Sequence, residues 1–267
     1  MLREGIEDEI ASWIKKQVED RGSDGALIGL SGGIDSATVA ALAKNGLGEE
    51  CLGVLLPAEG TTEKDNEYAR MVADTVGIDT VTLDLTDLNM EVKELFHSLD
   101  IKRVQRECYP ETALRTDEGP KEMSEKTMQP RLRMMALYYI AECKNYAVLG
   151  GSNKSELLTG YFTRYGDGAA DLCPLWDLLK TEVWELAERL DVPDEVINRP
   201  PTGGLQSDGD RVKDAEEVGL DYETFDEIYV ALEEGGDLSR FDIEDVNRAV
   251  ELMAEASNNL DIPGFEK

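Results

Sequence analysis

The segment "LSGGIDS" at residues 30–36 places two serines, two glycines and one acid directly behind an apolar run. Gly32 and Gly33 allow positive φ angles and a close approach of the backbone to a ligand. Consecutive amides at the start of a helix attract anions. Asp35 would repel a bare phosphate, but it could hold a divalent cation that bridges phosphate oxygens. No lysine follows the glycines, so this is not the common phosphate loop. The alternative is an ordinary glycine-rich turn with Asp35 as a favourable first-turn acid.

A second polar segment, residues 148–182, also follows an apolar run. Glu156 is a candidate for a second metal ligand. Arg164 and Lys180 are cations in a chain that has few, and Asp167 stands between two glycines. For each cation the alternative is a surface ion pair contributing less than about 1 kcal/mol.

Arg131 and Arg133 follow Pro130, which suits the first position of a helix over residues 130–145. Cations at a helix start act against the helix dipole, so an anionic partner is expected. That partner could be a substrate phosphate or carboxylate for either arginine, or a neighbouring acid.

The elements that would position these residues alternate between strands and helices. Short apolar runs predict strands, and helical spacing of apolar residues predicts helices. The expected strands are residues 26–30, 51–58, 79–85 and 146–152. The expected helices are residues 2–20, 35–46 with Gly46 as a stop, 63–77, 130–145 and 177–193. This order predicts an α/β fold with a parallel sheet flanked by helices, whose ligands bind at the carboxyl ends of the strands.

Two segments lack a sustained period. Residues 100–129 are expected to form a long connection, and the proline- and glycine-rich residues 199–210 a loop. The acidic C-terminal third is expected to be mostly helical.

The composition narrows the function classes. Asp and Glu number 57 against 27 Lys and Arg among 267 residues, for a net charge of −30. This suits a folded protein with an acidic surface in a salty cytoplasm, and a basic protein partner is the alternative. Without a basic cluster, no nucleic-acid partner is expected. The four cysteines form no Cys-x-x-Cys pair, and His97 is the single histidine. Neither a signal peptide nor a membrane-length apolar run is present, so a cytoplasmic protein without a membrane partner is expected.

The two polar segments carry a resemblance to a known family. "LSGGIDS" resembles the pyrophosphate loop of the N-type ATP pyrophosphatases, whose fold is Rossmann-like and of the adenine nucleotide alpha hydrolase type. "GSNKSELLTGYFTRYGDGAADLCPLWDLLKTEV" is similar to the hallmark run of the ammonia-dependent NAD synthetases, and "RPPTGGL" resembles that family's second loop. The likeness extends from about residue 5 to about residue 232.

The resemblance implies a reaction. The carboxylate of deamido-NAD attacks the α-phosphorus of ATP, and pyrophosphate leaves. Ammonia then displaces AMP from the adenylate to give NAD. The resemblance also implies one NAD synthetase domain over residues 1–267 without an amidase domain, and a homodimer with deamido-NAD at its interface.

The roles of site residues follow from the same resemblance. ATP would be bound by Gly29, Leu30, Ser31, Gly32, Gly33, Ile34, Asp35, Ser36, Gly151, Lys180 and Thr202. Deamido-NAD would be bound by Arg131, Arg164 and Asp171. Mg²⁺ would be held by Asp35 and Glu156, and Asp35, Lys180 and Asp167 would be catalytic.

The chain also departs from the family's pattern. Gly151 replaces a threonine, Arg164 replaces a lysine, and "ASNNLDIPG" at residues 256–264 stands where many relatives have a His-Lys pair. Two other readings stay open: another adenylating member of the superfamily, and a catalytically silent nucleotide-binding sensor.

Overall fold

The computed structural model describes residues 2–98, 118–199, 215 and 218–260. The strands are β1 Gly25–Gly29, β2 Cys51–Leu55, β3 Asp79–Thr82 and β4 Tyr146–Leu149. The helices are α1 Ile6–Arg21, α2 Ile34–Leu47, α3 Glu63–Val76, α4 Thr86–His97, α6 Glu118–Lys144, α7 Lys154–Thr159, α8 Lys180–Arg189, α9 Asp194–Ile197, α11 Tyr222–Glu234 and α12 Ile243–Leu260, with a 3-10 turn, η1, at Leu238–Arg240.

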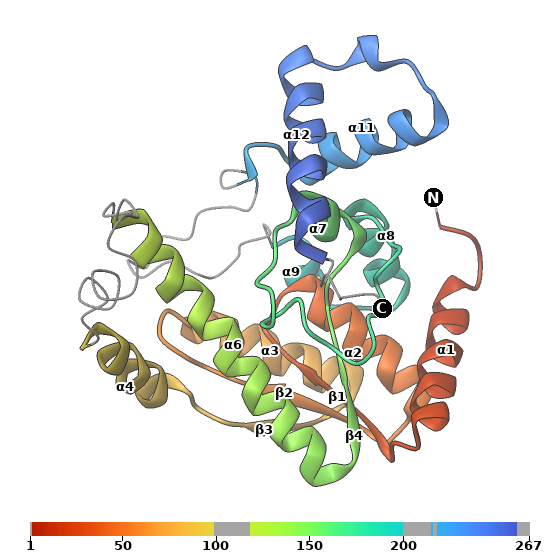
Figure 1. The fold of residues 1–267 in the computed structure, drawn as a ribbon. Helices are drawn as coiled ribbons and strands as arrows, with labels where there is room; N and C mark the ends of the chain where they lie inside the picture. Colours follow the sequence, from red (N-terminus) through yellow and green to blue (C-terminus); the bar gives the residue numbers. More distant parts are fainter. Residues whose placement is uncertain (1, 99–117, 200–214, 216–217, 261–267) are drawn as a thin grey trace, which may run out of the picture.

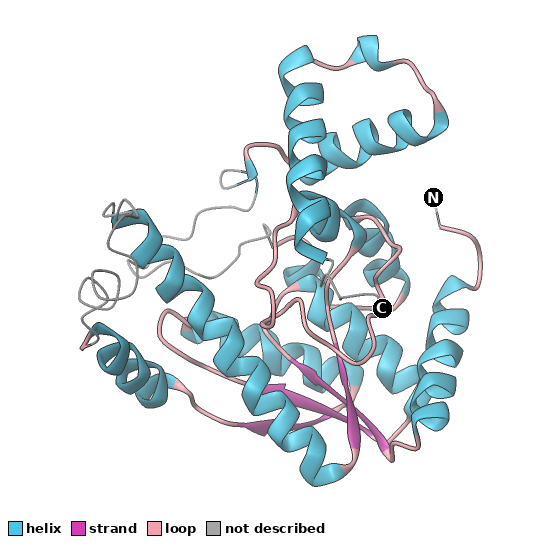
Figure 2. Ribbon diagram, viewed as in Figure 1, coloured by secondary structure: helices cyan, strands magenta, loops and turns pink. Residues whose placement is uncertain are grey.

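The strands form a parallel sheet in the order β3-β2-β1-β4 (Figure 2). The central strand β1 pairs with β2 on one side and with β4 on the other. The predicted α/β fold with a parallel sheet is therefore confirmed. The carboxyl ends of β1 and β4 lie side by side, which brings the two polar segments of the sequence to one edge of the sheet.

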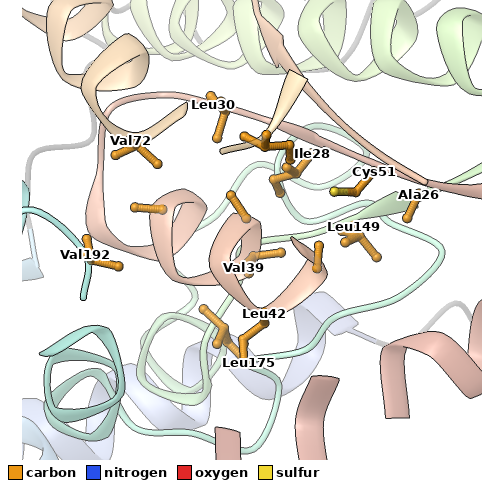
Figure 3. Close-up of a cluster of buried hydrophobic side chains, with 14 of the residues drawn as sticks. Ala26, Ile28, Leu30, Val39, Leu42, Cys51, Val72, Leu149, Leu175 and Val192 are labelled. Carbon is orange, nitrogen blue, oxygen red and sulfur yellow. The ribbon is translucent and has the colours of Figure 1, made fainter. Parts of the chain in front are cut away.

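Side chains of β1 alternate between two apolar layers. Ala26 and Ile28 face a layer built by α1, α2, α3 and α8, part of which Figure 3 shows. Leu27 faces the opposite layer, where α6 supplies Met134 and Leu137. Each fully buried leucine contributes roughly 2 kcal/mol to folding through loss of apolar surface from water. Helices thus pack on both faces of the sheet (Figure 1), and the loops at its carboxyl edge follow directly from these packed strands.

Helix α6 corrects one expectation. It begins at Glu118, so residues 118–129 are helical rather than part of a connection, and Pro130 lies inside the helix. Polar contacts hold this first part of α6. Glu125 pairs with His97 of α4 at 2.6 Å, and the Gln129 side-chain amide donates to the Glu59 carbonyl at 2.6 Å. Apolar spacing could not reveal a segment held this way.

Gly46 corrects a second expectation. Helix α2 runs through Gly46 to Leu47, and its C-cap is Gly48 with a φ of 62°. A Cβ atom at position 46 would lie 2.3 Å from the Ala11 carbonyl oxygen. Gly46 therefore permits close packing of α1 on α2 and does not stop the helix.

The described part of the C-terminal third is mostly helical, as expected. The helices α11 and α12 form a hairpin with its own apolar cluster, including Phe225 and Ile228 (Figure 1). The hairpin packs against α7 and α8, which border the carboxyl edge of the sheet. None of the described helices is long and apolar enough to cross a membrane. The connection that continues through residues 99–117 and most of the 199–210 loop lie outside the described residues.

Candidate active site

The loop between β1 and α2 is organised by its two serines. The Ser31 amide and hydroxyl both contact the Ser36 hydroxyl, at 3.3 and 3.1 Å. The Ser36 hydroxyl donates to the Gly33 carbonyl at 3.0 Å, and the Gly33 amide donates to the Ser31 hydroxyl at 3.2 Å. These bonds hold the amides of residues 31–33 in a tight turn at the start of α2, where the dipole favours an anion.

Gly32 is required in this turn. Its φ is 74°, a left-handed conformation that side chains disfavour. A Cβ atom there would lie 2.6 Å from the Asp65 carbonyl oxygen, which is main chain and cannot easily move. The loop therefore lies directly on the start of α3.

Asp35, Glu156 and Lys180 form the charged centre of the site. The Lys180 ammonium lies 2.5 Å from Oδ2 of Asp35 and 3.3 Å from Oε1 of Glu156. The lysine is 1% exposed. The structure thus joins residues from α2, α7 and α8 that are up to 145 positions apart in the sequence.

Asn153 orients both carboxylates. Its Oδ1 accepts from the Glu156 amide at 3.0 Å, and Glu156 Oε2 accepts from the Asn153 amide, which makes a capping box at the start of α7. Its Nδ2 donates to Oδ1 of Asp35 at 2.9 Å. The sequence carried a signal for this residue, because an Asn followed three positions later by Glu is typical of a helix start.

Asp226 holds the start of α8 and was not predicted. This 2% exposed carboxylate accepts from the Thr181 amide at 2.9 Å and from the Ser155 hydroxyl at 2.5 Å. The same hydroxyl accepts from the Lys180 amide at 2.8 Å. Burial raises the pKa of Asp226, while its hydrogen bonds lower it. Helix α11 thereby fixes the backbone of Lys180.

Burial raises the pKa of Glu156 to about 8. The neighbouring charge of Asp35 acts in the same direction, and the Lys180 ammonium acts in the opposite direction. A divalent cation beside the two carboxylates would favour the charged form of Glu156.

We expect the stability of the metal-free protein to fall as pH rises from about 4.5 to about 8, because the folded pKa of Glu156 is raised from 4.5 to about 8. Within that window the folded protein keeps a proton that the unfolded chain releases, so the contribution is complete below the lower pKa and is lost above the higher one. The slope is at most about 1.4 kcal/mol per pH unit. Urea unfolding across this range should show a shallower slope for Glu156→Gln. Equal slopes of the free energy of unfolding against pH in the two proteins would contradict the raised pKa of Glu156.

Arg131 and Arg164 lie together. The Arg131 Nε donates to the Arg164 carbonyl at 3.1 Å. Gly166 makes this approach possible, because a Cβ atom there would lie 2.8 Å from Pro130 Cβ. The Arg164 guanidinium lies 5.2 Å from the Tyr165 ring centroid.

The helix-start argument for Arg131 and Arg133 is wrong. Both lie deep inside α6, where the dipole at its start does not reach them. Arg133 donates instead to the Leu56 carbonyl and the Thr61 hydroxyl, both at 3.1 Å. It therefore joins α6 to the segment after β2.

Asp167 lies beside the loop at Ser152, whose hydroxyl donates to the Asp167 carbonyl at 3.3 Å. Its carboxylate accepts from the Thr163 amide at 3.1 Å. The residue as a whole is exposed. Desolvation raises the pKa of its carboxyl group, and the hydrogen bonds from Thr163 lower it.

Asp171 lies further from the charged centre, along the edge of β4. Its Oδ2 accepts from the Val148 amide at 2.8 Å, and it borders a cleft of about 280 Å³ with Arg21, Tyr138 and Asn145. Tyr138 lies roughly 10 Å from Arg131 along the α6 axis, by the rise of an α-helix. No described contact joins Asp171 directly to Arg131 or Arg164.

The remaining predicted residues fall in two groups. Gly29, Leu30 and Ile34 lie in or beside the loop, and Gly151 lies against Asp35, where an added Cβ atom would make an ordinary contact at 3.6 Å. Thr202 and the end of the 256–264 segment lie outside the described residues.

Comparisons with known proteins identify the family of the chain. A family model described as NAD synthase matches residues 6–261. An NH(3)-dependent NAD(+) synthetase from Finegoldia magna is 39% identical over 220 residues, which are 82% of this chain and 81% of that protein. The structure of an NH3-dependent NAD synthetase from Campylobacter jejuni has a TM-score of 0.75 and 27% identity, and all of both chains is covered. The structure of an NMN synthetase from Francisella tularensis has a TM-score of 0.82 and 26% identity, with 100% of this chain and 99% of that chain covered. The chain therefore belongs to the NAD synthase family.

Proposed function

We propose that this protein is a ligase that completes NAD biosynthesis by amidating deamido-NAD with ammonia at the expense of ATP. The observation that carries the proposal is the Asp35–Lys180–Glu156 cluster, in which a buried lysine pairs with two half-buried carboxylates directly behind the glycine-rich loop at residues 30–36. Membership of the family indicates the class of substrate, and the charged side chains of the cluster are suited to binding a polyphosphate.

The chemistry needs activation of a carboxylate. Ammonia does not displace oxide from a carboxylate at a useful rate. In the first step an oxygen of the nicotinate carboxylate bonds to the α-phosphorus of ATP, and the bond to the β-phosphate oxygen breaks. In the second step ammonia bonds to the acyl carbon, AMP leaves, and a proton is lost from nitrogen. Holding the departing pyrophosphate is largely a matter of position and charge.

The loop residues Gly29–Ser36 would bind the phosphates of ATP, with their amides directed at the β- and γ-phosphates. The Lys180 ammonium would neutralise charge that develops on the leaving pyrophosphate. Gly151 would offer only its backbone, and Thr202 would contribute its hydroxyl.

Mg²⁺ fits the carboxylates of Asp35 and Glu156. Hard oxygen donors suit it, and it is commonly held by one or two carboxylates together with substrate phosphates. The described residues contain no group of three or more metal-binding His, Cys, Asp or Glu side chains, and substrate phosphates would supply further ligands. When bound, the ion would supply charge neutralisation of the phosphate oxygens.

Deamido-NAD would lie along α6. Arg131 and Arg164 would bind its anionic groups near the charged centre, and Asp171 would bind it further along, at the 280 Å³ cleft. Asp167 would accept the proton lost by ammonium. Desolvation of its carboxyl group supports this role, because a raised pKa makes a better base.

One assay tests the proposal. The protein is incubated with ATP, Mg²⁺, ammonium and deamido-NAD, and we expect NAD, AMP and pyrophosphate in equal amounts. ADP in place of AMP would contradict cleavage next to the α-phosphorus. Turnover with another carboxylate alone would favour a different adenylating enzyme, and binding of ATP without turnover would favour a silent sensor. Glutamine in place of ammonium should give no product.

A second candidate is amidation of nicotinate mononucleotide. It is favoured by the TM-score of 0.82 against the NMN synthetase, compared with 0.75 against the NAD synthetase of similar identity. The same assay with nicotinate mononucleotide decides between them. A higher kcat/KM for deamido-NAD is expected, since the relative at 39% identity is named for NAD.

We further propose a single-domain, cytoplasmic homodimer. Met135 and Tyr139 are 58% and 72% exposed and lie one turn apart on α6, beside Arg131. An interface there would cover both side chains and place deamido-NAD between subunits. Light scattering of the purified protein measures this state.

The net charge of −30 supports a halophilic enzyme. We expect the unfolding midpoint to rise steeply between about 0.1 and 1 M KCl, because the Debye length falls from about 10 to about 3 Å and repulsion among carboxylates is screened. The same measurement in sucrose at matched osmolarity is the control, because sucrose is excluded from the protein surface but does not screen charges. Full stability and activity in dilute buffer would contradict a halophilic adaptation.

A further inference from the structure

The Arg199 side chain contacts the glycine-rich loop at residues 30–36 through the Gly32 carbonyl. This residue follows α9 and stands at the beginning of the second loop of the sequence. Its NH1 donates to the Gly32 carbonyl at 3.2 Å, and its NH2 lies 2.5 Å from Oδ1 of Asp65. Neither the spacing nor the motifs of the sequence predicted this contact.

The contact with Gly32 controls a specific peptide group. The Gly32 carbonyl and the Gly33 amide belong to one planar peptide, so they point in opposite directions. Arg199 binds the carbonyl on the side of α3, and the Gly33 amide then faces Ser31 Oγ at 3.2 Å inside the loop. If this peptide turned over, a carbonyl oxygen would face the bound anion in place of a donor. Glycines on both sides make such rotation sterically cheap.

Asp65 holds Arg199 in place. Its carboxylate is nearly fully buried, and its second oxygen accepts from the Thr62 amide at 2.7 Å and the Thr62 hydroxyl at 2.8 Å. The Arg199 guanidinium also lies 5.3 Å from the Tyr68 ring centroid. The start of α3 therefore fixes the guanidinium from two directions.

We infer that Arg199 is a positioning residue that keeps the Gly32–Gly33 peptide oriented so that its amide, which donates to the Ser31 hydroxyl, stays on the inside of the loop that would bind the phosphates of ATP. The inference rests on the proposed function, in which this loop binds the triphosphate. The positive charge at the carbonyl also polarises the peptide and makes its amide a stronger donor. Arg199 acts through the loop, because both of its terminal nitrogens are engaged on the far side.

The test compares three variants for binding of pyrophosphate and ATP by calorimetry in the presence of Mg²⁺. Arg199→Met removes the contact. Arg199→Lys keeps the charge, but one ammonium cannot hold both partners in the same fork geometry. Arg189→Met is the matched control, because Arg189 also binds carbonyls, those of Leu2 and Arg3, and pairs with Glu185, far from the loop.

We expect Arg199→Met to raise the Kd for pyrophosphate and for ATP by roughly 10- to 100-fold, which corresponds to the loss of one hydrogen bond to a charged group. The Kd for deamido-NAD should change less than about twofold. Arg199→Lys should remain at least about fivefold weaker than the wild type. Arg189→Met should bind both ligands normally.

Three results would overturn the inference alone. Normal pyrophosphate binding by Arg199→Met would remove the positioning role, and full recovery in Arg199→Lys would assign the effect to charge alone. Equal losses for all ligands, with a larger fall in unfolding midpoint than in Arg189→Met, would assign it to folding. A wild-type protein that binds neither pyrophosphate nor ATP would instead overturn the proposed function, and this inference with it.

Discussion

An Asp35→Asn variant should lose at least roughly 10²- to 10³-fold in kcat while keeping its fold, the loss typical when one electrostatic stabiliser of a transition state is removed. The carbonyl oxygen of the new side chain can still accept from Asn153 Nδ2, which lies 2.9 Å from Oδ1 in the wild type. The new amide would face the Lys180 ammonium, which lies 2.5 Å from Oδ2, and two donors would then oppose each other. The charge that holds both Lys180 and the proposed Mg²⁺ is lost. The measurement is NAD formation at saturating ATP.

The control for this variant is Asp177→Asn. Asp177 pairs with Lys154 at 2.8 Å on the surface and takes no part in the charged centre. It should retain full activity, and both variants should be folded in the absence of urea. Substantial activity of Asp35→Asn would remove Asp35 from the proposed metal site.

A Lys180→Met variant should also lose roughly 10²- to 10³-fold in kcat, because the buried cation between Asp35 and Glu156 is removed. The affinity for Mg²⁺ is a second measurement that distinguishes loss of the positive charge from loss of the folded structure. Without the competing ammonium, the two carboxylates should bind Mg²⁺ more tightly in the absence of nucleotide, even though turnover is lower.

Lys154→Met is a close match for this change. Its ammonium pairs with a carboxylate and lies 5.3 Å from the Tyr229 ring, much as that of Lys180 lies 5.5 Å from the Tyr222 ring. We expect this control to keep wild-type kcat and Mg²⁺ affinity. Wild-type turnover in Lys180→Met would refute a catalytic role for Lys180, and weakened Mg²⁺ binding would show that loss of structure dominates.

The parallel sheet could be predicted because each buried strand is a short apolar run that is followed in the sequence by residues typical of a turn. Strand β1 followed by the glycine-rich loop is the clearest case. The first part of α6 could not be predicted in the same way. Its polar side chains contact Glu59 and His97, which belong to other segments, and Pro130 suggests a helix start where none exists.

The candidate site divides similarly. Asp35, Glu156 and Lys180 stand in motifs, and Asn153 stands in a local capping pattern, so each carries a signal in the sequence. Arg199 and Asp65 are 134 positions apart, and Ser155 and Asp226 are 71 apart. Contacts over such separations depend on how α3, α9 and α11 pack, and local patterns in a single sequence do not predict that packing.

The hydrogen bonds of Asp226 make the docking of the α11–α12 hairpin measurable at the start of α8. The amide hydrogens of Lys180 and Thr181 bond to Ser155 Oγ and to Asp226, and the Asp226 carboxylate belongs to α11. Ser155 belongs to α7, so only the Thr181 amide is bonded directly to α11, and its exchange with deuterated water requires the bond to Asp226 to open. The exchange rate of the Thr181 amide would report the free energy with which the hairpin docks, at the residue next to Lys180 in the chain.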